Sequence, residues 1–75
     1  MRFFFDYKSS DRSLYDYRGD EFGSAKGAIE FATEMAGFLS HSLQAEWAGW
    51  CVEVRNPDGT IVFQKQVATP RRVAA

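Results

Sequence analysis

The chain begins with three consecutive phenylalanines followed by an Asp-Tyr-Lys segment, and this aromatic-rich pattern predicts a β-strand from Arg2 to Lys8. Successive side chains of a strand point to opposite faces of its sheet. Phe3, Phe5 and Tyr7 therefore share one face, and Phe4 falls on the other face with two charged residues. The three consecutive phenylalanines place large apolar surface on both sides of the sheet, so each side needs a cover or a partner.

A second strand is expected from Ser13 to Tyr17, antiparallel to the first. The intervening residues 9–11, two serines and an aspartate, are turn formers, which predicts a hairpin. Residues 18–22 are then expected to form a loop, with Phe22 inserted into the core just ahead of a helix.

The pattern becomes helical after Ser24, whose hydroxyl is suited to accept a hydrogen bond from the first turn as an N-cap. Apolar residues then recur at intervals of three and four, which predicts an amphipathic helix from about Ala25 to Ala45. Such a helix is about 30 Å long and can cross a small sheet. Its apolar stripe consists of Ala25, Ala28, Ile29, Ala32, Met35, Ala36, Leu39 and Leu43, with Phe31 and Phe38 along one edge.

Alternation returns in two further predicted strands, from Trp50 to Arg55 and from Thr60 to Val67. The segment Asn56-Pro57-Asp58-Gly59 between them predicts a tight hairpin. Proline presets the second position of a type I turn, and glycine accepts the left-handed conformation that follows. The residues expected to face the helix are Trp50, Val52, Val54, Ile61, Phe63 and Val67.

The predicted fold class is α+β with the element order ββαββ, a four-stranded sheet with one long helix packed on one face. With strands numbered along the chain, their directions allow the first and fourth to pair in parallel at the centre. This favours a β-grasp-like sheet order 2-1-4-3. The wholly antiparallel order 2-1-3-4 is the alternative. We expect one domain over residues 1–69 and a flexible C-terminal tail over residues 70–75.

Three segments of the chain, in this order and spacing, resemble a family of short bacterial proteins catalogued only as a domain of unknown function. They are Arg2-Phe3-Phe4-Phe5-Asp6, Asp16-x-x-Gly19-x-Glu21-Phe22 before an alanine-rich helix, and Trp50-x-Val52-Glu53-Val54 followed by Asp58-Gly59. The resemblance extends to about Val67. It implies the element order and a small soluble domain, and it transfers no activity, cofactor or catalytic residue.

Composition narrows the classes of function. Nine basic and ten acidic residues give a net charge of −1, without the positive excess of a duplex DNA binder. A single cysteine excludes an internal disulfide, and with one histidine it forms no metal set, so we expect no metal or cofactor. No stretch approaches the roughly 18 apolar residues of a membrane span. We expect a cytoplasmic protein without membrane attachment.

Catalytic chemistry is not expected. Cys51 and His41 are the only candidates for a thiol nucleophile and its base, and a strand and the polar side of a helix are poor positions from which to meet. The acidic residues Asp16, Asp20 and Glu21 match no calcium-loop spacing, and turn and helix-cap chemistry explains them more simply.

The sheet face opposite the helix is the remaining candidate site. Phe4, Cys51 and Val62 fall on it by alternation. If Leu14 points toward the helix, Tyr15 and Tyr17 join Phe4 in an aromatic patch, which is the arrangement we favour; with the tyrosines inward, the patch shrinks. The candidate interaction surface is therefore Phe4, Tyr15, Tyr17, Cys51 and Val62.

Contiguous exposed apolar surface is typical of interaction sites. We therefore expect a non-catalytic interaction module that self-associates, as a homodimer, or binds a protein partner through the open aromatic face or a sheet edge. One alternative is a binder of single-stranded nucleic acid, since aromatic rings on a sheet can stack nucleobases. In this chain, however, acidic residues are interleaved with the Lys and Arg residues that would bind the phosphates. The other alternative is a small-ligand binder or enzyme, which would need an enclosed polar pocket.

Overall fold

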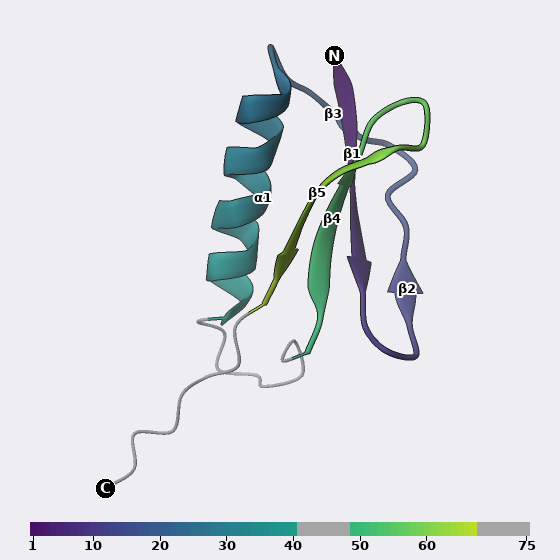
Figure 1. The fold of residues 1–75 in the computed structure, drawn as a ribbon, viewed down its shortest axis with the longest axis vertical. Helices are drawn as coiled ribbons and strands as arrows, with labels where there is room; N and C mark the ends of the chain where they lie inside the picture. The colour runs from purple at the N-terminus through teal and green to yellow at the C-terminus, as the bar shows by residue number, and fades with distance from the viewer. Residues whose placement is uncertain (41–48, 68–75) are drawn as a thin grey trace, which may run out of the picture.

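The computed structural model describes residues 1–40 and 49–67. One helix, α1, lies along one side of a twisted antiparallel sheet, as Figure 1 shows. The elements are β1 (Arg2–Lys8), β2 (Ser13–Leu14), β3 (Asp20–Glu21), α1 (Ala25–Ser40), β4 (Cys51–Arg55) and β5 (Ile61–Gln66). The predicted α+β class, with a single helix on one face of the sheet, is confirmed.

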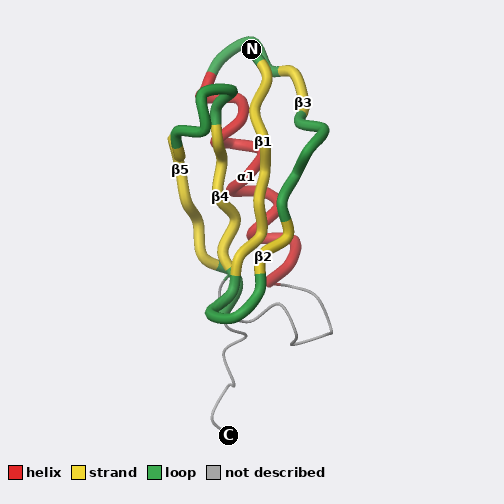
Figure 2. Tube along the Cα trace, turned by 90° about the vertical axis from the view of Figure 1, so that its right-hand side faces the viewer, coloured by secondary structure: helices red, strands yellow, loops and turns green. Residues whose placement is uncertain are grey.

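The sheet order is β2-β1-β4-β5, and β3 pairs with β1 along the same edge as β2. Figure 2 looks onto the sheet with α1 behind it, and shows β4 and β1 at the centre and β5 at the opposite edge from β2 and β3. Every pairing is antiparallel. The favoured order 2-1-4-3 is therefore wrong, and the antiparallel alternative 2-1-3-4 is the one observed.

The burial of the two C-terminal strands explains this correction. In β4, Val52 and Val54 are fully buried and Glu53 is nearly so, whereas most of β5 is exposed. A strand that carries water-exposed polar residues suits an edge. Lys65 of β5 lies opposite Val52, so its charge sits on the helix side of the sheet, a position that only an edge strand leaves open to solvent.

The edge beside β1 is interrupted, whereas a continuous strand was expected there from Ser13 to Tyr17. Only two residues pair in β2, where Leu14 lies opposite Tyr7, and pairing resumes in β3, where Asp20 lies opposite Phe3. The segment predicted as a loop thus contributes a short strand. Beyond β3, the Phe22 amide donates to the Met1 carbonyl at 2.8 Å.

The helix begins as the sequence predicts. The Gly27 amide donates to the Ser24 hydroxyl at 3.4 Å, which is the third-residue contact of an N-cap. Ala28, Ala32 and Ala36, one turn apart, are buried against the sheet. Small side chains at these positions let the helix backbone lie close to the sheet, where α1 contacts β4 and β5 more extensively than β1.

Aromatic rings fill the end of the core at the start of α1. Phe22 stacks edge-on against Phe3 and Phe5, with ring centroids 6.2 and 5.6 Å apart, so its predicted insertion into the core is confirmed. Phe31 of the helix lies 5.1 Å from the Phe5 ring. Phe38, at the edge of the predicted stripe, is 81% exposed.

The predicted hairpin between β4 and β5 is present. The Gly59 amide donates to the Asn56 carbonyl at 3.0 Å, and Gly59 has a φ of +85°. The strand register shifts by one residue beside Arg55, which places Ile61 opposite Arg55 on the face away from the helix. The expectation that Ile61 faces the helix is therefore wrong, because this irregularity reverses the alternation. The expected end of the helix near Ala45 and the tail from residue 70 lie outside the described residues.

Candidate interaction surface

The sheet face opposite α1, called the open face below, carries charged residues in its middle and aromatic residues toward the β2 and β3 edge. Among the described residues no second layer covers it, as Figure 2 shows. The register of the two central strands places these side chains on it: Phe4, Asp6 and Lys8 from β1, and Cys51, Glu53 and Arg55 from β4.

Asp6 and Arg55 form the central ion pair of the open face. Arg55 donates to both carboxylate oxygens of Asp6, from Nε at 2.7 Å and from Nη2 at 3.2 Å. The same Nη2 donates to the Asp16 carbonyl at 2.9 Å. Asp6 is only 1% exposed, so a carboxylate on an uncovered face is nevertheless withdrawn from water. The fork of the guanidinium matches this bidentate arrangement.

A second ion pair balances the acid that lies directly opposite Asp6. Glu53 is that residue, and two like charges facing each other across a sheet are unfavourable. Lys8 compensates, with its Nζ 2.9 Å from Glu53 Oε1, and Gln64 donates to Oε2 at 2.9 Å. The hydrogen bond to Glu53 raises the pKa of Lys8. Asp6 is thus paired with Arg55 and Glu53 with Lys8, so the middle of the open face carries no net charge.

Asp16 replaces the missing part of the edge strand. Its carboxylate accepts the Phe5 amide of β1 at 3.1 Å, and also the amides of Arg18 and Gly19 at 3.0 Å each. Burial by itself would raise the pKa of Asp16, but these three amide donors, with the positive charge of Arg55, hold that pKa below its usual range. The Asp16 amide in turn donates to Asp6 at 2.9 Å, which fastens the edge segment to the central ion pair.

Gly19 allows this segment to lie flat against β1. Its φ is +71°, and a Cβ built there would be 2.9 Å from the Phe3 carbonyl oxygen and 3.0 Å from a ring carbon of Phe4. Only glycine fits such a position without displacing backbone. The Asp16-x-x-Gly19 spacing of this chain therefore has a structural explanation.

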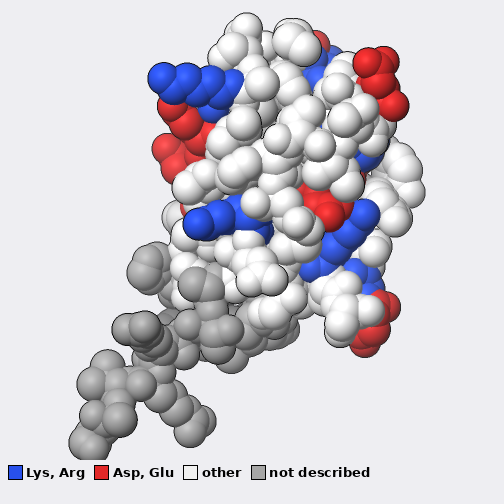
Figure 3. All heavy atoms as spheres, in the orientation of Figure 1, with Lys and Arg blue, Asp and Glu red and all other residues white. Residues whose placement is uncertain are grey.

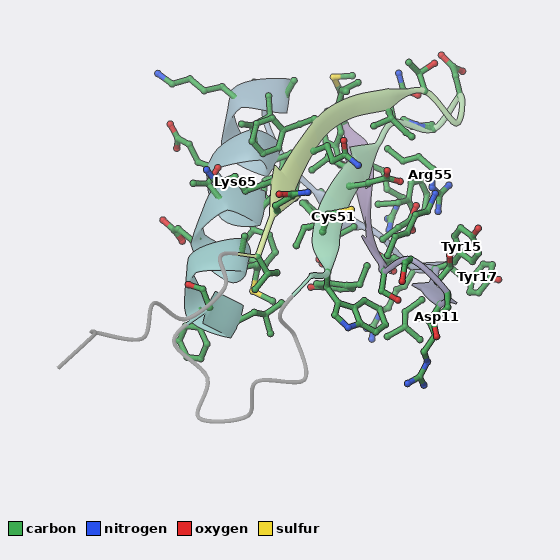
Figure 4. All side chains as sticks on the ribbon, turned by 60° about the horizontal axis from the view of Figure 1, so that its bottom comes forward. Asp11, Tyr15, Tyr17, Cys51, Arg55 and Lys65 are labelled. Carbon is green, nitrogen blue, oxygen red and sulfur yellow. The ribbon has the colours of Figure 1, made fainter. Side chains whose placement is uncertain are left out.

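Three aromatic rings surround a hollow at this corner of the open face, the aromatic hollow, with a volume of about 480 Å³. Its lining residues are Phe4, Tyr15, Asp16, Tyr17 and Arg55. Tyr17 is 88% exposed and Tyr15 51% exposed. Figure 4 shows both tyrosines projecting from the sheet on the side away from α1, with Arg55 nearby. The Arg55 guanidinium lies 4.8 Å from the centre of the Phe4 ring, a cation–π contact.

The five candidate residues divide into two groups. Phe4, Tyr15 and Tyr17 come together around the aromatic hollow, while Leu14, opposite Tyr7, takes the helix side of the sheet. Cys51 is half-buried and lies 3.4 Å from the Gln64 amide nitrogen, outside the hollow. Val62 is 38% exposed at the register shift beside Arg55 and also lies outside the hollow.

Sequence reasoning missed the parts played by Asp6, Asp16 and Arg55. The available signal was the same acid-x-base pattern in two strands, Asp6-x-Lys8 and Glu53-x-Arg55. In antiparallel neighbours with the two acids opposite each other, this pattern places each acid diagonally next to the base of the other strand. The signal could be interpreted only once the two strands were known to be adjacent.

A second hollow, of about 410 Å³, lies on the helix side between α1 and the β2 edge. Leu14, Phe31 and Met35 are among its lining residues, and Leu14 is 46% exposed. Its lining also includes the polar residues Tyr7, Tyr15, Asp16 and Asp20, so Tyr15 and Asp16 border both hollows.

Within residues 1–40 and 49–67, no group of three or more histidine, cysteine or acidic residues is placed to hold a metal ion. The helical structure in these ranges lacks the combination of length and apolar character that a membrane span requires. His41, the expected partner in any Cys51 chemistry, lies outside the described residues.

Comparison with known proteins identifies a family and no activity. A family model described as "Domain of unknown function (DUF6894)" matches residues 2–68. This agrees with the resemblance carried by the three sequence segments. No curated protein and no solved structure matches the chain.

Proposed function

Because the chain belongs to this family of unknown function, we propose its role from the geometry of the open face: it is a non-catalytic domain that binds a protein through the aromatic hollow. The observation that carries the proposal is the exposure of Tyr15 and Tyr17 beside a hollow on an uncovered sheet face. Protein interfaces are enriched in tyrosine, phenylalanine and arginine, the residue types that line this hollow.

The rigidity of the hollow supports the same role. Tyr15 and Tyr17 flank Asp16, whose carboxylate, amide and carbonyl are all hydrogen-bonded to β1, β4 or the following turn. Two exposed aromatic side chains are thus mounted on a fixed backbone. Binding then costs less ordering entropy than it would on a mobile loop.

The paired charges make nucleic acid a poor partner. Lys8 lies over the Tyr15 ring and Arg55 over the Phe4 ring, and each of these two basic residues is already paired with an acid. Figure 3 shows basic and acidic side chains next to one another on the side it draws, without a broad basic patch. A nucleic-acid backbone is bound chiefly through available positive charge.

Photocrosslinking in the cells that make the protein tests the proposal. Benzoylphenylalanine is placed at Tyr17 in one chain and, as a matched control, at Phe38, a similarly exposed aromatic position on α1. We expect a covalent protein adduct from position 17 that position 38 does not give. The same adducts from both positions, or none from position 17, would overturn the proposal.

A further inference from the structure

We propose that the protein bound at the aromatic hollow is a second copy of this chain, related to the first by a two-fold axis that runs parallel to the open face, so that the two open faces meet. The inference rests on the proposed function and identifies its partner. Two-fold interfaces are self-complementary, so a single patch must supply both sides of every contact. The open face meets this requirement in its shape and in its charge.

The shape of the patch includes a projection and a recess side by side. Tyr17 is 88% exposed and projects from the edge segment, and the hollow of about 480 Å³ lies beside it, bordered by Phe4 and Arg55. With a two-fold axis passing beside Tyr17, the ring of each copy enters the hollow of the other. Aromatic rings there meet Phe4 and Tyr15 at edges and faces, the packing that such rings prefer.

The charges of the patch favour a copy of itself over a charged partner. Asp6 is paired with Arg55 and Glu53 with Lys8, so the open face has no unbalanced charge to select an acidic or basic protein. Two identical faces of this kind approach without like-charge repulsion, and the net charge of the chain is only −1. A strongly charged face would repel its own copy.

Sedimentation of the purified chain over a concentration series tests the proposal, with two variants matched in the aromatic surface they remove. Tyr17→Ser removes the projection, and Phe38→Ser removes an exposed ring from α1 on the other side of the sheet. We expect the wild-type and Phe38→Ser chains to form dimers and Tyr17→Ser to dissociate. Far-ultraviolet circular dichroism verifies that each variant is folded.

A mixture of wild-type and Tyr17→Ser chains makes the test quantitative. A buried tyrosine anchor at an interface is worth a factor of about thirty or more in dissociation constant. The mixed dimer keeps one of two such contacts, so its dissociation constant rises about thirtyfold, and that of the Tyr17→Ser dimer rises about a thousandfold.

Two results would overturn the inference. One is a wild-type chain that remains monomeric up to about 1 mM, the weak end of specific association. The other is a dimer that Tyr17→Ser leaves intact, which would place the contact elsewhere, such as the edge of β5. In either case a crosslink from position 17 to a different protein would leave the proposed function standing, so the two failures are distinguishable.

Discussion

Replacing Arg55 by methionine should strongly destabilise the domain, although Arg55 is on an uncovered face. The substitution keeps much of the aliphatic length over the Phe4 ring and removes the guanidinium. Asp6 then keeps its hydrogen bond from the Asp16 amide but loses both donors of its ion pair, at 2.7 and 3.2 Å. A carboxylate that is 1% exposed is left without a cation.

The expected loss is about 3 kcal/mol. Removing one partner of a buried ion pair typically costs about 3 to 5 kcal/mol, and the 26% exposure of the Arg55 side chain favours the lower end. A chain of 75 residues has a total free energy of unfolding of about 4 to 11 kcal/mol. The variant should therefore remain folded with a small margin, and its melting temperature should fall by about 12 °C or more.

Urea unfolding followed by circular dichroism measures the effect, with two further variants that isolate its cause. Arg55→Lys keeps the charge without the bidentate geometry and should fall between wild type and Arg55→Met. Asp6→Asn combined with Arg55→Met removes the unpaired charge while the Asn oxygen still accepts the Asp16 amide. This double variant should be more stable than Arg55→Met alone by about 1 kcal/mol or more.

The difference in stability between the double variant and Arg55→Met tests whether an unpaired buried charge is the cause. A double variant less stable than Arg55→Met would mean that the charge left on Asp6 is not what destabilises the single variant. A loss below about 1 kcal/mol in Arg55→Met would place the pair with ordinary surface ion pairs and would refute the reasoning from burial.

Two other predictions concern the edge segment. Gly19→Ala should lower the free energy of unfolding in urea by about 2 kcal/mol, because Gly19 has a positive φ and the new Cβ would lie 2.9 Å from a β1 carbonyl oxygen. Gly23→Ala is the control and should change stability little, because no atom lies within 4 Å of its Cβ position. Equal effects of the two substitutions would contradict this reasoning. The pKa of Asp16 is lower in the folded than in the unfolded chain, so its stabilisation is full above the ordinary value near 3.8 and is lost as pH falls through the folded pKa. Between pH 5 and pH 3, wild type should therefore lose more stability than Asp16→Asn, and parallel losses would argue against the role of the carboxylate.

Local signals were sufficient to predict the elements of this fold. Ser24 marks the start of the helix, and the Asn56–Gly59 turn marks the second hairpin, because each depends on hydrogen bonds within a few residues. The alternation of Phe3, Phe4 and Phe5 likewise depends only on strand geometry. Such features require no knowledge of the rest of the chain.

The strand order and the edge interruption depend on contacts between distant residues, so they could not be derived in the same way. Strand directions allowed two orders. The observed order buries β4 and leaves β5 at the edge, and it pairs Asp6 and Lys8 with charges about 50 positions away in β4. The replacement of ladder hydrogen bonds by the Asp16 carboxylate also needs β1 alongside. Strand alternation predicted that Phe4, Tyr15 and Tyr17 share one face of the sheet. It did not predict the hydrogen bonds of Asp6, Asp16 and Arg55 beside them.

The interrupted edge limits how this sheet can grow. Along β2 and β3 an incoming strand would find only two-residue segments, and between them the Asp16 carboxylate already occupies the Phe5 amide of β1. The outer edge of β5 is continuous over six residues and has no strand paired to it among the described residues. A sheet with a single usable edge can join one other sheet and then has none left. Strand addition in this protein would therefore end at a pair and could not propagate into a fibre.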